Sequence, residues 1–313
     1  MKIYAVIVTC NAMKWMEKSL SSLFCDNRHG IRPHVIVADN ASTDGTLEYI
    51  SRTFPEAEII RTAESDVNPD VKHGFTAAAQ AGIDRALASG AEAVLLMHHD
   101  VWLAPEALEA LEACCTDDSL LVPAYLNGPG TDYETSFSSK TVRHSRELRK
   151  ALKKNRADAG KIRVGNVPSG CWLIPADLIK ETGPLNPFFD TASGTASEYL
   201  ARLRYRSKGI FVVPEARVFH DRDSYGDRTL YDKNDIFRDL LLIGCDPGKC
   251  GIARGAARIS LFFGLVRKTV HYRVNLFPTY FNDLRRIRAL RPELRKLRRR
   301  YEDFSVSLHS DSI

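Results

Sequence analysis

Two aspartates stand at positions where carboxylates often do chemistry, each after an apolar, strand-like run. Asp39 ends the run that starts at His34, and Asp100 follows Val94–Met97 with two histidines between. In an open parallel sheet, the carboxyl ends of the strands line the crevice where ligands bind. A carboxylate there can accept the imide N–H of uracil or thymine, and Mg²⁺ or Mn²⁺ can bridge a carboxylate and substrate phosphates. The pattern predicts a nucleotide at Asp39 and a metal-bound diphosphate near Asp100, as in an enzyme that uses a nucleotide-sugar.

Both aspartates also have a structural interpretation. Asp39 opens a turn rich in Asn, Ser, Thr and Asp, which turns favour, and Asp44 is a candidate N-cap for the next helix. Asp100 is the stronger candidate because a carboxylate after an apolar strand costs free energy unless it is solvated, paired or metal-bound. His98 could add a borderline ligand that favours Mn²⁺ over Mg²⁺. For His98 and His99 taken singly, hydrogen bonding at the sheet edge is the preferred interpretation.

The elements that would position these residues alternate between strands and helices. Apolar, β-branched runs predict strands at 3–9, 34–39, 58–61, 93–97 and 120–123, and helical spacing occurs at 13–24, 46–54, 74–88 and 105–114. This alternation predicts a mostly parallel α/β sheet flanked by helices. Residues 125–167 are then expected to form a mobile, basic loop. Later segments predict a strand at 170–175, helices at 176–181 and about 197–207, and a strand at 210–213.

The composition limits the class of protein. The chain has 313 residues, of which 44% are hydrophobic and 27% charged, and this suits one α/β core with a smaller appendage. No signal-peptide pattern is present, and the apolar stretches are shorter than the roughly 20 residues of a membrane span. The seven cysteines form no C-x-x-C pair. They predict reduced thiols and a cytoplasmic location.

The net charge of +5 is unevenly distributed. Residues 254–300 carry fourteen Lys and Arg against two acidic residues, and residues 143–163 carry nine against two. Such surfaces meet anions, and anionic lipid headgroups are the leading candidate. Nucleic acid is not expected, because the basic segments lack interleaved aromatic residues.

The basic C-terminal region has a periodic apolar pattern with two open interpretations. It could lie on an anionic membrane as an interfacial helix, or pack on the catalytic body with its charged face solvated. Pro292 is expected to begin a new helix. The same two interpretations apply, more weakly, to the apolar segment at residues 259–266. The pattern is formed by Leu284, Ile287, Leu290, Leu294, Leu297 and Tyr301.

Several ordered blocks resemble family-2 glycosyltransferases of the GT-A fold. The most specific is Val37-Ala-Asp-Asn-Ala-Ser-Thr-Asp-Gly-Thr46, and Leu95-Leu-Met-His-His-Asp-Val101 follows in the expected place. Gly170-Cys-Trp-Leu-Ile-Pro175 and Val213-Pro-Glu-Ala-Arg-Val-Phe-His220 match the second half. The resemblance covers roughly residues 1–225 and includes bacterial rhamnosyltransferase-like enzymes of surface polysaccharide synthesis.

The resemblance implies a role for each matched position. His98 and Asp100 would occupy the first and last places of the family's Asp-x-Asp metal motif. His220 would match a histidine that completes the metal or diphosphate site. The bound ion, Mn²⁺ or Mg²⁺, would act as a Lewis acid on the departing nucleoside diphosphate. Contacts with the nucleotide-sugar are expected from Thr9, Asn11, Asp39, Asp44 and His98.

One departure from the family pattern concerns the general base. Family members carry a Glu-Asp pair where this chain has Thr195 and Ala196, and loss of a general base costs about 10²–10⁴ in rate. One interpretation is that the pair has been removed, naturally or by design, leaving an enzyme that binds but turns over poorly. Alternatively the base has moved to Glu198 or Asp190, or the local alignment is offset. Glu198 also has a structural interpretation, as a solvated helix residue paired with Arg202.

These observations predict an inverting glycosyltransferase with a GT-A domain over 1–225 and a helical, basic extension over 226–313. The expected donor is a UDP- or dTDP-sugar and the expected acceptor a glycan or a lipid-linked molecule. The expected location is cytoplasmic, peripheral at the inner face of a membrane. One alternative is an inactive homologue that binds nucleotide-sugar or partner proteins. A sugar nucleotidyltransferase is disfavoured because Cys10–Met13 has none of the glycines that a triphosphate loop needs.

Overall fold

The chain folds into two compact units. The computed structural model describes residues 1–24, 31–62, 74–154, 160–189, 191–222, 233–272 and 276–310. Unit 1 comprises residues 1–196 and 208–224, and unit 2 comprises residues 197–207 and 225–313. Asp190, one of the two candidate bases, lies outside the described residues. The domain boundary expected at residue 225 stays a prediction.

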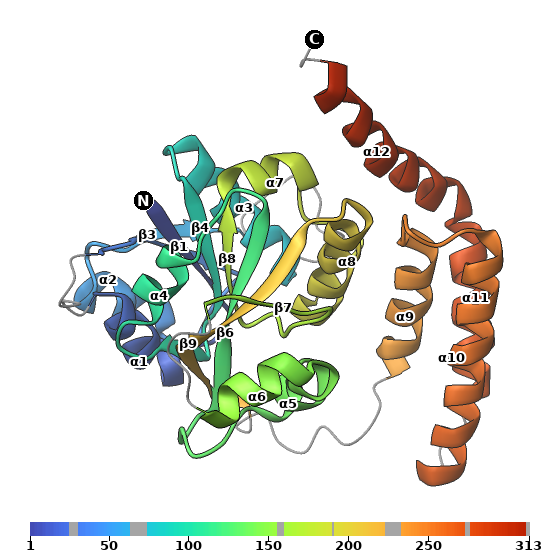
Figure 1. Cartoon of the computed structure of the whole chain (residues 1–313), viewed down its shortest axis with the longest axis horizontal. Helices are drawn as coiled ribbons and strands as arrows, with labels where there is room; N and C mark the ends of the chain where they lie inside the picture. The colour runs from blue at the N-terminus through green and yellow to red at the C-terminus, as the bar shows by residue number, and fades with distance from the viewer. Residues whose placement is uncertain are drawn as a thin grey trace. The chain divides into compact units, whose positions relative to one another are not determined.

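The first half of unit 1 is the parallel part of its sheet (Figure 1). Strands β1 (Ile3–Thr9), β2 (His34–Asp39), β3 (Glu58–Arg61) and β4 (Ala93–His98) pair in parallel in the order β3-β2-β1-β4. Helices α1 (Met13–Phe24), α2 (Thr46–Thr53) and α3 (Phe75–Ala88) connect them. All seven residues of β1 are buried, as expected for an apolar central strand.

The second half of the sheet is mixed. Beyond β4 the order continues β8-β6-β9-β5, with β7 paired to β9. Strand β8 (Cys171–Pro175) is antiparallel to β4 and β6, whereas β6 (Ser119–Asn127) is parallel to β9 (Gly209–His220). Strand β5 (Val101–Leu103) is antiparallel to β9, and α4 (Ala107–Ala113) and α7 (Ala176–Thr182) complete this half. The predicted α/β sheet flanked by helices is confirmed, with antiparallel strands in its second half.

The segment 125–167, expected to be a loop, contains regular structure. It holds α5 (Thr135–Lys140), the 3₁₀ helix η1 (Val142–His144), α6 (Arg146–Lys154) and β7 (Ile162–Arg163). Glu134 caps α5 by accepting a hydrogen bond from the backbone N–H of Phe137 at 2.7 Å. Phe137 and Leu148 are fully buried. The loop prediction was wrong because single buried apolar residues anchor these short helices among polar and basic neighbours.

Unit 2 is helical, as predicted for the chain after His220. It contains the second part of α8 (Ala192–Tyr205), together with α9 (Lys233–Cys245), α10 (Gly251–Tyr272), α11 (Phe277–Ala289) and α12 (Arg291–Ser310). Helix α8 begins five residues before the expected start at 197, and Pro292 lies in the first turn of α12, as predicted. Within the described residues, none of the helices combines the length and the apolar composition that a bilayer span requires.

Half of the periodic apolar pattern of the C-terminal region is buried, and Leu284, Leu290 and Leu297 are half-buried. Ile287, Leu294 and Tyr301 are each at most 7% exposed, and α11 packs on α9 inside unit 2. The large apolar side chains that unit 2 exposes lie mainly on α10, where Ile252 is 87% and Phe263 66% exposed. Helices α11 and α12 therefore pack within unit 2. Packing of the C-terminal region on the catalytic body and its binding to a membrane both stay predictions. The most exposed apolar side chains lie on α10, which includes residues 259–266.

Candidate active site

Three candidate residues meet where β4 ends and β5 pairs with β9. The register places Val101 opposite His220, and the N–H of Asp221 donates to the carbonyl of Asp100 at 3.0 Å. As a result, His220 Nε2 lies 3.3 Å from Asp100 Oδ2, and His98 Nδ1 lies 3.9 Å from Asp100 Oδ1. One donor atom from each of the three residues lies within 4.8 Å of the others. The short strand β5, which sequence patterns missed, is what creates this cluster.

The electrostatics of the cluster suit a divalent cation. Burial lowers the pKa of His98 to about 3, so this imidazole is neutral near pH 7 and keeps a lone pair for a metal. Burial alone would raise the pKa of Asp100, but the hydrogen bond from His220 and the neighbouring imidazoles outweigh it, so this pKa is lowered and the carboxylate stays ionised.

The donor set also fits a metal ion. His98 Nε2 and His220 Nδ1 are buried and have no hydrogen-bond partner among the described residues. Two imidazoles and one carboxylate form a borderline donor set, which suits Mn²⁺ better than Mg²⁺. His98, Asp100 and His220 could therefore hold the expected ion.

Two residues that sequence reasoning did not assign shape the cluster. A Cβ added at Gly170 would lie 3.0 Å from the ring of Tyr125 and 3.5 Å from Cε1 of His220, so glycine allows this close approach. The hydroxyl of Tyr125 donates to the carbonyl of Cys171 at 2.8 Å, and its ring lies 6.0 Å from that of His220. Gly170 begins a block that marks the family resemblance, whereas Tyr125 gave no signal in the sequence.

His99 is held by structural contacts. Its Nδ1 lies 3.2 Å from the carbonyl oxygen of Val8, and its ring lies 5.2 Å from that of Trp15. The indole N–H of Trp15 in turn donates to Asp221 at 2.8 Å. The structural interpretation preferred for His99 fits this arrangement.

On the nucleotide side, Asp39 is buried and engaged by the turn that it opens. Its Oδ1 accepts hydrogen bonds from the hydroxyls of Thr9 at 3.0 Å and Ser42 at 2.5 Å, and its Oδ2 accepts from the N–H of Ser42 at 3.0 Å. These contacts fit the structural interpretation of Asp39 as a turn residue. Because Oδ2 has one protein donor, it retains capacity to accept a further hydrogen bond, and a contact with the base stays a prediction.

Asn11 and Asp44 connect the loops that follow β1 and β2. Asn11, which has a positive φ of 50°, accepts at Oδ1 from the N–H of Thr43 at 2.8 Å. Asp44 accepts at Oδ2 from the N–H of Met13 at 3.1 Å, and at Oδ1 from the N–H of Thr46 at 3.1 Å. The N-cap prediction for Asp44 was wrong, since the N-cap residue of α2 is Gly45; Asp44 lies one residue earlier and accepts from the first residue of the helix. The structure thus joins Thr9, Asn11, Asp39 and Asp44 into one network at the same sheet edge as the metal cluster.

Buried, uncharged side chains stand at the two positions where the family pattern has its Glu-Asp pair. Thr195 is buried, and its hydroxyl donates to the carbonyl of Thr191 at 2.9 Å and contacts the hydroxyl of Thr76. Ala196 is also buried. Neither position can accept a proton from an acceptor hydroxyl.

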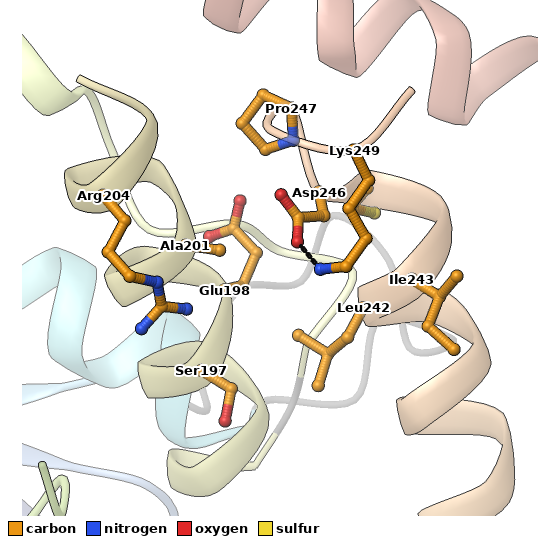
Figure 2. Close-up of a pocket in the computed structure, with 10 residues that line it drawn as sticks. Ser197, Glu198, Ala201, Arg204, Leu242, Ile243, Asp246, Pro247 and Lys249 are labelled. Carbon is orange, nitrogen blue, oxygen red and sulfur yellow. Dashed lines mark hydrogen bonds and ion pairs between the residues drawn. The ribbon is translucent and has the colours of Figure 1, made fainter. Parts of the chain in front are cut away.

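Glu198, a candidate displaced base, forms a buried ion pair in unit 2. Its Oε2 lies 3.0 Å from a terminal guanidinium nitrogen of Arg202 and accepts from Nε at 3.1 Å. The predicted pairing with Arg202 is confirmed, but the expected solvation is wrong, since the two side chains are 3% and 1% exposed. Figure 2 shows Glu198 on α8 at a cavity of about 170 Å³, with the ion pair between Asp246 and Lys249 on the opposite side.

Comparison with known families agrees with this geometry. Residues 4–183 match the family described as Glycosyl transferase family 2. This chain belongs to glycosyl transferase family 2. Among curated proteins, none matches it significantly.

Solved structures with the same fold include two enzymes with bound ligands. GalNAc-T7 with UDP, GalNAc and Mn²⁺ is 15% identical, with a TM-score of 0.58 over 78% of this chain and 48% of that one. TarS of S. aureus is 17% identical, with a TM-score of 0.57 over 97% of this chain and 54% of that one. Residues 1–349 of TarS with UDP-GlcNAc are 17% identical, with a TM-score of 0.53 over 99% and 92%. The family-2 chain described here spans about half the length of GalNAc-T7 and of full TarS.

Proposed function

We propose that this chain is an inverting glycosyltransferase that moves a sugar from a UDP- or dTDP-sugar to a glycan or lipid-linked acceptor in polysaccharide synthesis. The observation that carries the proposal is the buried His98–Asp100–His220 cluster at the carboxyl ends of the sheet strands in a family-2 chain. The fold-related structures were solved with UDP, with UDP-GlcNAc, and with UDP, GalNAc and Mn²⁺. They favour UDP as the carrier. Deoxyhexosyl donors, as in rhamnosyltransferase-like members, are included in the proposal.

In this proposal, each part of the site has a task. His98, Asp100 and His220 would hold Mn²⁺ or Mg²⁺, which when bound supplies Lewis-acid stabilisation of the departing diphosphate. The free acceptor capacity of Asp39 would receive the imide N–H of the base. The hydrogen bonds of Asn11 and Asp44 hold both loops in place before the donor arrives, so little conformational entropy is lost on binding.

The general base is the weakest part of the catalytic arrangement. Glu198 already accepts a hydrogen bond from Nε of the buried Arg202 and forms an ion pair with its guanidinium, which favours a structural role for this carboxylate over a displaced base. Asp190 remains the other candidate. We therefore infer an enzyme that binds its donor and turns over slowly, and the second candidate function is an inactive homologue that binds nucleotide-sugar.

We also infer that unit 2 attaches the protein to the cytoplasmic face of an anionic membrane. Ile252, Ile259 and Phe263 recur along α10 at spacings of seven and four residues, so they share one helix face, and each is at least 60% exposed. Arginines lie along the same helix. Exposed apolar side chains beside arginines are typical of a helix that lies in the headgroup region.

Calorimetry of nucleotide binding tests the main proposal. UDP and dTDP are titrated into the wild-type chain and into Asp100→Asn, with and without Mn²⁺, and Asp177→Asn removes an exposed carboxylate as the matched control. We expect Mn²⁺ to strengthen binding in the wild type and the control but not in Asp100→Asn. Release of nucleoside diphosphate from UDP- and dTDP-sugars is then measured before and after the double change Thr195→Glu/Ala196→Asp.

The outcomes of these measurements distinguish an active transferase from an inactive homologue. Turnover that appears only after the double change indicates a transferase without its base, and turnover in the wild type indicates a base elsewhere in the chain. Binding with no turnover in either protein supports the inactive homologue. If neither nucleotide binds, the glycosyltransferase proposal fails for this chain.

A further inference from the structure

A separate cavity of about 340 Å³ lies in unit 1 beside α5 and α6. Among the described residues that line it, most side chains are polar and none is acidic. They come from the end of α5, from η1, from the start of α6 and from the segment after β7. The polar and basic residues of the lining are Ser139, Lys140, Thr141, His144, Ser145 and Asn166.

One of these residues has an unused polar group. Thr141 is only 2% exposed, and its hydroxyl oxygen is buried without a hydrogen-bond partner among the described residues. Its backbone N–H does donate, to the carbonyl of Phe137 at 3.0 Å. A buried hydroxyl without a partner costs stability. It is retained more easily if a ligand supplies the missing hydrogen bond.

The remaining groups around the cavity favour a negative charge. Ser145 caps α6, since its hydroxyl accepts from the N–H of Leu148 at 3.2 Å. The cavity therefore adjoins the positive end of a nine-residue helix. Lys140 and His144 add a cation and an imidazole to the lining, and α6 itself carries five Lys and Arg against one Glu.

We propose that this cavity binds the phosphate group of a ligand. The geometry that supports this is the Thr141 hydroxyl, which has no partner in the described part of the chain, beside Lys140, His144 and the start of α6, with no carboxylate among the described lining residues. Phosphate offers several strong acceptor oxygens to such donors. The same chemistry is available from free phosphate and from a phosphodiester within a larger molecule.

Helix α5 connects this cavity to the metal cluster. At its start, Glu134 forms an ion pair with Arg222, two residues after His220, at 3.5 Å. Phe137 of α5 packs against Tyr125 with ring centroids 5.8 Å apart, and Tyr125 in turn lies beside His220. A six-residue helix is about 9 Å long. We therefore assign the phosphate to the acceptor substrate, an assignment that rests on the proposed function, whereas phosphate binding itself does not.

Titration of the full chain with two phosphates tests the site. Inorganic phosphate and a glycerophosphodiester are titrated by calorimetry in EDTA, so that neither binds through a metal ion. Thr141→Val removes the hydroxyl at nearly constant volume, and Lys150→Gln removes one charge from α6 outside the cavity lining as the matched control. Thermal unfolding and Mn²⁺-dependent UDP binding are measured on the same proteins.

We expect saturable binding that Thr141→Val weakens at least tenfold and Lys150→Gln changes less than twofold. The Tm of Thr141→Val should be unchanged or higher, because the removed hydroxyl has no partner, and UDP binding should be unaffected. Tighter binding of the phosphodiester than of phosphate supports the acceptor assignment, and the reverse order overturns it in favour of free phosphate. Absence of saturable binding, equal weakening by both changes, or a lower Tm for Thr141→Val overturns the site itself. Failure of UDP binding in the wild type would instead count against the proposed function.

Discussion

Removal of either partner from the buried Glu198–Arg202 pair is expected to destabilise unit 2. The guanidinium of Arg202 lies 3.0 Å from the Glu198 carboxylate and over the rings of Tyr199 and Tyr301, 4.9 Å from each ring centroid. Burial alone would lower the pKa of Arg202, but attraction to Glu198 outweighs it, so this pKa is raised. The guanidinium of Arg202 is thus held in its charged form inside the protein.

The size of the effect depends on which charge is left behind. Breaking a buried ion pair costs about 3–5 kcal/mol, because the remaining charge is buried without compensation. Arg202→Met leaves a bare carboxylate, so we expect a loss near 5 kcal/mol. Glu198→Gln keeps an amide oxygen that accepts from the guanidinium, so we expect about 3 kcal/mol. The double change Glu198→Leu/Arg202→Met removes both charges and should return to within about 2 kcal/mol of the wild type.

Urea denaturation followed by circular dichroism measures these free energies of unfolding. Asp177→Asn breaks an exposed ion pair with Lys180, both side chains being at least 65% exposed, and should leave stability unchanged. The reasoning is refuted if Glu198→Gln keeps wild-type stability while turnover of a donor sugar falls about 10²–10⁴-fold. Those results together would identify Glu198 as the general base.

Further predictions concern the metal, the base, a thiol and the membrane. EDTA treatment of the wild type should lower UDP affinity to that of Asp100→Asn, and a remaining difference between them would contradict a metal at the cluster. Ala196→Asp alone should raise nucleoside diphosphate release by about 10²–10⁴-fold, whereas an unchanged rate would place the missing base elsewhere. Backbone hydrogen bonds from Ala253 and Ile252 lower the pKa of the exposed Cys250 thiol. At pH 7.5, iodoacetamide should therefore modify Cys250 before the other described cysteines, with Cys250→Ser as the control. A buried thiol that mass spectrometry finds modified first would contradict this prediction. Phe263→Glu should weaken sedimentation with anionic vesicles, and binding equal to the wild type would exclude the α10 face.

The parallel half of the fold and its chemistry were predictable from local patterns. Strand β1 is apolar throughout and fully buried, and Asp39 stands at the end of a strand in a turn with a specific composition. Such signals depend on neighbours in sequence. The sequence also named the three residues that the structure brings together, Asp100 and His220 as metal ligands and His98 as a nucleotide-sugar contact, and these roles stay predictions.

The remaining features depend on contacts between distant segments. The pairing of Val101 with His220 uses a three-residue strand that no periodicity reveals. Glu198 has the spacing of a surface helix pair, and only the packing around Arg202 buries it. Likewise, the composition of 125–167 conceals two helices because Phe137 and Leu148 are isolated apolar residues in a polar stretch. Burial of this kind is a property of tertiary structure that local composition does not encode.

The register of β9 has a consequence for the order in which the site is completed. The strands and loops of the nucleotide side lie within about the first hundred residues, whereas His220 is the last residue of the last strand in chain order. Because synthesis proceeds from the N-terminus, the turn network around Asp39 can form while the third residue of the proposed metal site is still missing. A chain that stops before residue 209 lacks all of β9. The complete His98–Asp100–His220 cluster is therefore confined to chains that have been synthesised past the end of the sheet, which links the proposed metal site to the integrity of the whole of unit 1.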